Sequence, residues 1–465
     1  MAPMTATVLA TLALLSSTTA HPGGAYKAPK FPSASISLYD QLFCAGSSLI
    51  VGTPFNLKAG TCQNSPSNTT YISANICLSD AVPWGYECKS GNFSGTGFNT
   101  IFRPNSGPPG GTTFKNAFTP APPTAPSENV LELNLTTETL NFGSPLGTVP
   151  NRGLGSQAPV FLNGVPYVQS VNDVSNLATG GRNGAPLGIH FETGLWMHLP
   201  ASTVDPPLAA SVVRMGSIPH GTTINAQALE PTQTFKGPPQ IPAVDITPFV
   251  IGSNPPIKIK FASQTASNVA TPRLPQDLSK FIAAGTITQE ILQDPNVVLR
   301  TANKGKNIIQ TQVFTVSTAA TSPELGGGTA NIAFLLGTGS QGPNANAATM
   351  TATFWINTVQ STLTVPGTPT GGTGSAPLRV VQSPEPPHPG ARVPSFVLPP
   401  STVVGEHTIT VTHTEIQYSQ TVNLNFAGLT WPHVSVATLV PTEELPVHGH
   451  EDDDLGPRIV GQNGH

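Results

Sequence analysis

The sequence predicts a mainly β protein: an antiparallel β-barrel with a short helical insertion, preceded by a small disulfide-stabilised module. From about residue 128 onward, many segments alternate apolar and polar residues, which is the pattern of a half-buried strand. Turn-forming residues separate these segments, and the 465-residue chain holds 45 glycines and 49 prolines. Only 9% of the residues are charged, against about 25% in an average soluble protein, which favours an extracellular all-β protein.

The first 20 residues are typical of a secretory signal peptide. An apolar core at 8–15 is followed by small residues at 18–20, before the expected cleavage site. This core is too short to span a membrane, so we expect a secreted, extracellular protein without a membrane partner. The mature chain would begin at His21. A copper site at that terminus is disfavoured, because the next histidine in the chain is His190.

All four cysteines lie near the amino terminus, at positions 44, 62, 77 and 88. In a secreted chain this clustering predicts two intramolecular disulfides, with three connectivities left open. We therefore expect a flexible lead at 21–36, a disulfide module at 37–102 and a proline-rich linker at 103–127. Sequons at Asn68, Asn92 and Asn134 predict glycans on or just after this module.

The barrel domain is predicted to span 128–442. Alternation begins at Val130, and further strands are predicted at 160–169, 189–199, 210–215, 222–226, 307–317, 329–336, 349–359, 408–413 and 415–425. Strands of this length, separated by turns, are typical of an antiparallel meander.

Two insertions interrupt this domain, at about 231–305 and 366–402. The first contains a helix candidate at 274–282 and a capping box from Thr286 to Gln289, and we expect its helices to cover one mouth of the barrel. The second is rich in glycine, proline and threonine, which favours a loop. The tail, 443–465, contains an acidic run and is predicted to be disordered.

The last predicted strand carries the most informative histidine. Residues 431–439 follow an alternating run, and a side-chain period of two places Trp431, His433 and Ser435 on one face. An imidazole on the inner face of a barrel can ligate a heme iron. The alternative interpretation is a hydrogen-bonded structural histidine.

A second segment strengthens the first interpretation. Residues 190–200 read His-Phe-Glu-Thr-Gly-Leu-Trp-Met-His-Leu-Pro, and a second strand ends in a Ser-Ile-Pro-His-Gly turn at 217–221. These segments resemble the central hairpin of the nitrobindin family, small heme-carrying barrels related to fatty-acid-binding proteins. The family's last strand reads His-(Leu/Val)-x-Ala-x-Leu, and residues 433–439 are similar except for one additional residue before the alanine.

The resemblance implies a secreted, calycin-like barrel that binds heme b. His433 would be the axial ligand of the iron, and His190, Met215 and Trp431 would contact the cofactor. Larger secreted fungal and actinobacterial proteins of this type are described as peroxidase-like. By that resemblance, His220 and Arg214 would act on peroxide at the open face of the iron.

Two other functions stay open. A heme barrel can bind gases or carry heme without turnover, and a calycin-like barrel without heme can bind an apolar metabolite or assist its conversion in a fungal biosynthetic pathway. The small net charge of −4, without a basic stripe, disfavours a nucleic-acid partner. The chain also lacks the Gly-x-Ser-x-Gly, His-Glu-x-x-His, Walker and dinucleotide motifs, which disfavours common hydrolases, metalloproteases and nucleotide-binding enzymes.

Overall fold

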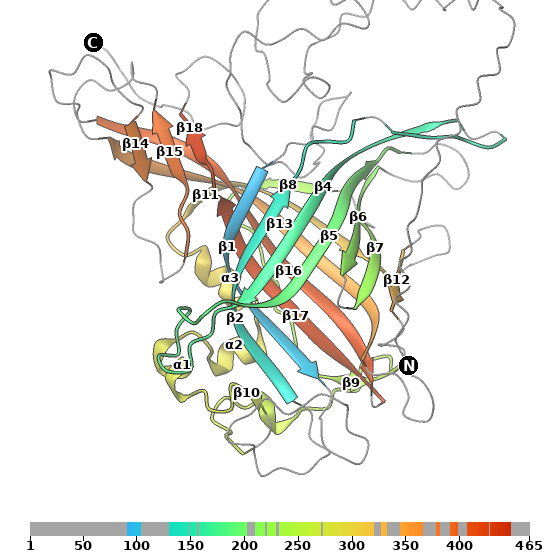
Figure 1. The fold of residues 1–465 in the computed structure, drawn as a ribbon, viewed down its shortest axis with the longest axis vertical. Helices are drawn as coiled ribbons and strands as arrows, with labels where there is room; N and C mark the ends of the chain where they lie inside the picture. The colour runs from blue at the N-terminus through green and yellow to red at the C-terminus, as the bar shows by residue number, and fades with distance from the viewer. Residues whose placement is uncertain are drawn as a thin grey trace, which may run out of the picture.

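A computed structural model describes residues 91–103, 130–147, 149–155, 158–201, 210–218, 221–228, 232–270, 273–319, 327–332, 345–365, 378–381, 391–398, 407–426 and 428–447. Its centre is a closed, antiparallel β-barrel of ten strands, which confirms the predicted antiparallel barrel and is compatible with a calycin-like fold (Figure 1). The predicted signal peptide, cysteines and disulfides lie outside the described residues.

The ten barrel strands follow one another around the wall in chain order. They are β1 (Gly91–Arg103), β2 (Val130–Phe142), β4 (Val160–Asp173), β5 (Leu187–Leu199), β6 (Ser211–Ile218), β7 (Thr222–Ala228), β11 (Asn307–Ser317), β13 (Asn346–Val365), β16 (His407–Phe426) and β17 (Leu429–Pro441). β17 pairs with β1, and β2 pairs with β4, so the sheet closes on itself. The two strands predicted at 408–413 and 415–425 are one continuous strand, β16.

Short strands flank this wall. β3 (Val149–Asn151) pairs with β4, β9 (Phe249–Val250) with β17 and β10 (Arg273–Leu274) with β2. β8 (Gln233–Lys236) and β12 (Gly328–Asn331) lie where β7 meets β11. β7 and β11 share only two residue pairs, Ala228 with Val316 and Gln227 with Ser317. β12 pairs with the rest of β7, and β8 pairs with β11, so these two strands support the weakest seam of the wall.

Strand alternation sorts the apolar side chains into two cores. Inside the barrel, aromatic side chains such as Trp196, Phe314 and Phe354 pack edge-to-face or stacked, with ring centroids 5.0–5.6 Å apart. The second core lies on the outer face of β1, β2 and β17, with members such as Leu133 and Val434. Full burial of an apolar side chain contributes roughly 1.5–3 kcal/mol, so both faces of this part of the sheet stabilise the fold.

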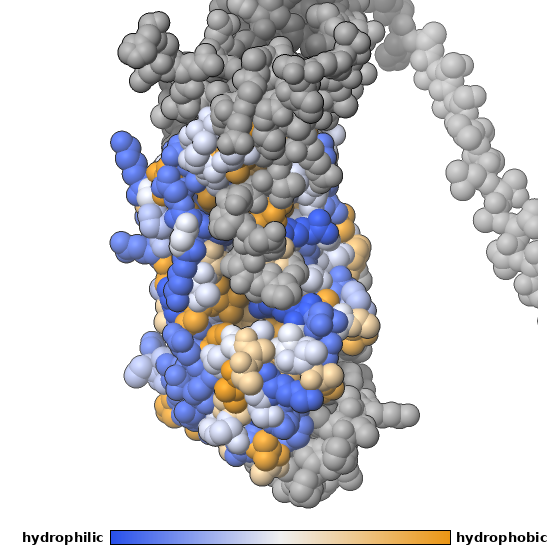
Figure 2. All heavy atoms as spheres, turned by 90° about the vertical axis from the view of Figure 1, so that its left-hand side faces the viewer, coloured by the Kyte–Doolittle hydropathy of each residue, from blue (hydrophilic) through white to orange (hydrophobic). Residues whose placement is uncertain are grey.

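The outer core is covered by the helical insertion. Its helices are α1 (Ser279–Ala284), α2 (Gln289–Gln293) and α3 (Val297–Ala302), preceded by the 3-10 turn η2 (Ala262–Gln264). The prediction that they cover a barrel mouth is wrong, since they pack beside β1, β2 and β17 (Figure 1). The predicted cap is also displaced, because Thr288 caps α2 by accepting from the Ile291 N–H. The outer surface of this region mixes hydrophilic and hydrophobic residues (Figure 2).

β1 was assigned from sequence to the disulfide module, whereas it closes the barrel between β2 and β17. The barrel therefore begins near residue 91 and not near 128. The reason for the error is the glycine content of this strand. A Cβ on Gly95 would lie 1.9 Å from the Thr438 carbonyl oxygen, and a Cβ on Gly97 would lie 2.7 Å from a carboxyl oxygen of Glu138. Glycine makes this close packing possible and also weakens the apolar alternation that marks a strand.

Two further boundaries differ from the prediction. β14 (Leu378–Val381) and β15 (Ser395–Leu398) lie in the expected loop insertion, and β18 (Glu444–Pro446) lies in the expected tail. The three form a small sheet around a third core that includes Phe396, Leu398 and Leu445. The sequon residue Asn134 points into the barrel, where it is 3% exposed, so this folded barrel leaves no room for a glycan there.

Candidate functional site

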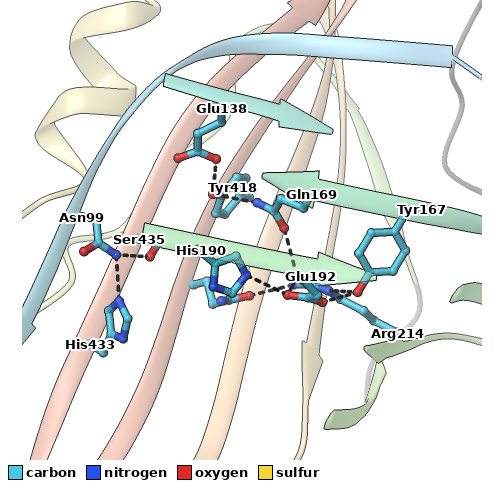
Figure 3. Close-up of polar contacts among 11 residues, drawn as sticks. Asn99, Glu138, Tyr167, Gln169, His190, Glu192, Arg214, Tyr418, His433 and Ser435 are labelled. Carbon is cyan, nitrogen blue, oxygen red and sulfur yellow. Dashed lines mark hydrogen bonds and ion pairs between the residues drawn. The ribbon is translucent and has the colours of Figure 1, made fainter. Parts of the chain in front are cut away.

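The candidate site lies inside one end of the barrel, which we call the histidine end. β5 and β17 both begin at this end, and they carry His190 and His433 near their starts. The wall is antiparallel, so β6 ends and β7 begins at the same end. Figure 3 shows the inner polar side chains, which run from His433 past His190 to Arg214.

A buried ion pair forms the floor of this end. The Arg214 Nη2 lies 2.9 Å from each carboxylate oxygen of Glu192. The same guanidinium donates to the Tyr167 hydroxyl at 3.0 Å, to Gln420 Oε1 at 2.7 Å and to Gln169 Oε1 at 3.3 Å. Burial alone would raise the pKa of Glu192, but the positive charge of Arg214 and the hydrogen bonds from His190 and Tyr167 together outweigh burial and lower that pKa to about 2. Both groups are therefore charged, and each compensates the buried charge of the other.

A second buried carboxyl group, that of Glu138, lies beside this floor. It accepts hydrogen bonds from the Tyr418 hydroxyl and, at 3.0 Å, from the Thr136 hydroxyl. Gln169 connects the two groups, because its Nε2 donates to the Tyr418 hydroxyl at 3.0 Å. Burial raises the pKa of Glu138 despite the hydrogen bonds that lower it. One barrel thus holds two carboxyl groups whose pKa values are displaced in opposite directions.

The glycines of this region explain part of the Glu-Thr-Gly motif. A Cβ on Gly194 would lie 2.6 Å from the Tyr167 ring, and a Cβ on Gly216 would lie 2.4 Å from Oε1 of Glu192. Both glycines leave the space in which Tyr167 and Glu192 meet. The motif is therefore accounted for by packing around the ion pair.

His433 lies on the inner face of β17, half-buried, as the alternation predicts. Its Nε2 is 2.7 Å from Asn99 Nδ2, and the same amide nitrogen donates to Ser435 Oγ at 2.7 Å. Asn134 Nδ2 in turn donates to Asn99 Oδ1 at 3.2 Å. Asn99 on β1, supported by Asn134 on β2, thus holds the imidazole.

His190 faces the same interior, and its Nε2 lies 3.2 Å from Oε2 of Glu192. Its side chain is 18% exposed, whereas that of Glu192 is fully buried. His198 has the same parity on β5, and burial lowers its pKa to about 4. His220 lies outside the described residues.

Three predicted site residues have other surroundings than expected. Met215 alternates with Arg214 on β6 and therefore faces the outer wall. Trp431 is fully buried, stacks on Phe426 with a 4.7 Å centroid distance and donates its Nε1 hydrogen to the Phe426 carbonyl. Arg214 is buried and forms an ion pair with Glu192.

The surroundings of His433, Met215 and Trp431 differ from those that the resemblance implies for a heme site. Iron binds a ring-nitrogen lone pair of imidazole, and Nε2 of His433 is engaged by Asn99. Of the other residues expected around the cofactor, Met215 faces outward and Trp431 belongs to the core. Within the described part of the chain, no group of three or more His, Cys, Asp or Glu side chains is placed to hold a metal ion.

Comparison of the chain with protein-family models, with curated proteins and with solved structures gives no match. The site must therefore be interpreted from its own geometry. Among the described helices, none combines the length and the apolar character that crossing a membrane requires. A pocket of about 330 Å³ lies at the helical insertion, lined by residues that include Asp245, Lys260 and Gln264. It lies outside the barrel and apart from the charged network.

Sequence reasoning missed most of the inner network. Strand parity places Glu138, Tyr167, Gln169, Tyr418 and Gln420 on inner faces, but it does not show which of them meet. Their contacts join residues up to 280 positions apart, such as Tyr418 and Glu138, and depend on the register between the strands that carry them. The one available signal was the presence of charged and amide side chains at inward positions of an otherwise charge-poor chain.

Proposed function

We propose that this chain is a ligand-binding β-barrel whose ligand occupies the histidine end. One observation carries the proposal: the exposure of inward-facing side chains changes along the barrel axis. The aromatic core and the Arg214–Glu192 floor are buried, whereas His190, Val422, His433 and Ser435 are partly exposed. Solvent therefore reaches these four inward-facing side chains and does not reach the floor.

The side chains at this end favour an amphiphilic small molecule. Asn99, His190, His433 and Ser435 offer hydrogen bonds, and Val422, which pairs directly with His433, offers an apolar surface. Binding sites of this kind combine an apolar wall with a few polar groups that orient the ligand. Peroxide turnover has no support in the described geometry, because Arg214 is neutralised by Glu192.

Heme b is a second candidate for the ligand. His433 favours it, since this residue lies on the inner face of the closing strand at the accessible end. The hydrogen bond to Asn99 opposes it. Titration of the purified protein with heme separates the two candidates: a Soret band that is lost in His433→Ala supports heme, and no Soret band in the wild type excludes it.

The binding proposal itself is tested with the fluorescent probe 1-anilinonaphthalene-8-sulfonate, an amphiphile with an apolar ring system. Val422→Trp fills the histidine end and should weaken saturable binding at least about tenfold. Val168→Trp is the matched control, because Val168 is 37% exposed and lies on an outward position of β4. Circular dichroism establishes that both variants are folded. Unchanged binding by Val422→Trp, or equal losses in both variants, would refute the proposal.

A further inference from the structure

Asn99 on β1 contacts two inward-facing side chains of β17, those of His433 and Ser435. It pairs directly with Ser435 in the sheet, and its amide nitrogen lies 2.7 Å from both Ser435 Oγ and His433 Nε2. Its amide oxygen accepts from Asn134 at 3.2 Å. Hydrogen bonds at both the nitrogen and the oxygen therefore fix the orientation of the Asn99 amide, with its nitrogen toward the imidazole.

This orientation determines which ring nitrogen carries the proton. An amide N–H is a donor only, so Nε2 of His433 must accept, and in a neutral imidazole the proton then resides on Nδ1. The Nε2 lone pair is used by this hydrogen bond. Iron or another metal ion would need that lone pair for coordination through Nε2.

We propose that Asn99 is a positioning residue that holds His433 as the Nδ1–H tautomer and withholds Nε2 from metal ions. The histidine then acts as a hydrogen-bonding group at the histidine end and not as a metal ligand. This inference concerns the unliganded barrel, so it stands or falls separately from the proposed binding function.

The tautomer is measured directly by long-range ¹H–¹⁵N correlation spectra of the full chain at pH 8, where an ordinary histidine is neutral. His433→Gln identifies the signals of His433. Wild type and Ser435→Ala should carry the proton on Nδ1. Asn99→Asp is nearly isosteric but offers only acceptor atoms, so it should move the proton to Nε2. A wild-type His433 protonated on Nε2, or an unchanged tautomer in Asn99→Asp, would overturn the proposal.

The second measurement uses heme as the probe. Asn99→Ala releases Nε2 of His433, and heme affinity should rise roughly five- to tenfold above wild type. This factor corresponds to the free energy of one hydrogen bond, which heme must break in the wild type and not in the variant. The gained Soret band should vanish in Asn99→Ala/His433→Ala. Asn99→Asp serves as the matched control: its heme affinity should not rise, because Nε2 of His433 is protonated in this variant. Equal heme affinity of wild type and a folded Asn99→Ala would show that Asn99 does not withhold the imidazole.

Discussion

The two buried carboxyl groups inside the barrel should give opposite contributions to the pH dependence of stability. For Glu192, burial raises the pKa, but Arg214 and the hydrogen-bond donors around it lower the pKa further, from 4.5 to about 2. For Glu138, burial raises the pKa above 4.5, and the hydrogen bonds from Tyr418 and Thr136 do not compensate. Each carboxyl group therefore serves as a control for the other, because the same change of pH should affect their contributions to stability in opposite directions.

The magnitude for Glu192 follows from its displaced pKa. A displacement from 4.5 to about 2 corresponds to about 3 kcal/mol at about 1.4 kcal/mol per pKa unit. Because the folded pKa is depressed, this stabilisation is present above pH 4.5 and is lost as the pH falls toward 2. Glu138 has the opposite sign: its protonated form stabilises the fold below pH 4.5, and this contribution is lost as the pH rises through the elevated pKa.

The assay is urea unfolding of wild type, Glu192→Gln and Glu138→Gln between pH 3 and 7, followed by circular dichroism. At pH 7, Glu192→Gln should lose roughly 3–5 kcal/mol, because it leaves Arg214 buried without a partner. The difference between wild type and Glu192→Gln should shrink by about 2 kcal/mol from pH 5.5 to 3. The stability of wild type relative to Glu138→Gln should instead increase as the pH falls.

The double variant Glu192→Gln/Arg214→Met tests whether the loss arises from the unpaired charge. It should be more stable than Glu192→Gln alone, since the buried cation is removed together with its partner. The reasoning is refuted if the two stability differences change in the same direction with pH, or if Glu192→Gln costs no more at pH 7 than at pH 3.

Two further predictions concern single residues elsewhere in the barrel wall. Burial, with a smaller contribution from Lys306, lowers the pKa of His413 from 6.5 to about 3. The free energy of unfolding of the wild type should therefore fall by about 2 kcal/mol from pH 7 to pH 5, and that of His413→Leu should not show this fall. Parallel pH curves of the two proteins in urea unfolding would disprove this. Gly194→Ala should cost at least about 2 kcal/mol, because the added Cβ would lie 2.2 Å from the Met215 carbonyl oxygen. Gly188→Ala on the same strand is its control, with the nearest atom at 3.7 Å, and equal melting temperatures of the two variants would contradict the packing argument.

The sequence predicted the barrel because its strands carry a local signal. The period-two alternation of β17 placed His433 and Ser435 on one face, and in the structure this is the inner face. The same rule could have excluded Met215, because adjacent strand residues point to opposite faces. β1 escaped prediction since its inner positions are Phe93, Gly95, Gly97 and Asn99, in which apolar periodicity is interrupted by glycines that the close approach of neighbouring strands requires.

The partners of the site residues could not be predicted in the same way. Whether Arg214 meets Glu192 or a ligand depends on the register between β5 and β6, in which Arg214 pairs with Trp196 and Gly194 pairs with Gly216. Whether His433 offers Nε2 depends on β1, which lies more than 300 residues away in the chain. Such contacts are set by the closure of the barrel and leave no trace in the local sequence pattern.

The geometry also changes what the Glu-Thr-Gly resemblance can support. Glu192 is held by Arg214 and Tyr167, and Gly194 provides the space for Tyr167. Each residue of the motif that lies on the inner face thus has a role in packing or charge pairing within the barrel. Residues with such roles are required by any barrel that buries this ion pair, whatever it binds. The motif is therefore an argument for the architecture, and the evidence for a ligand rests on the histidine end alone, where Asn99 decides how His433 presents its ring nitrogens.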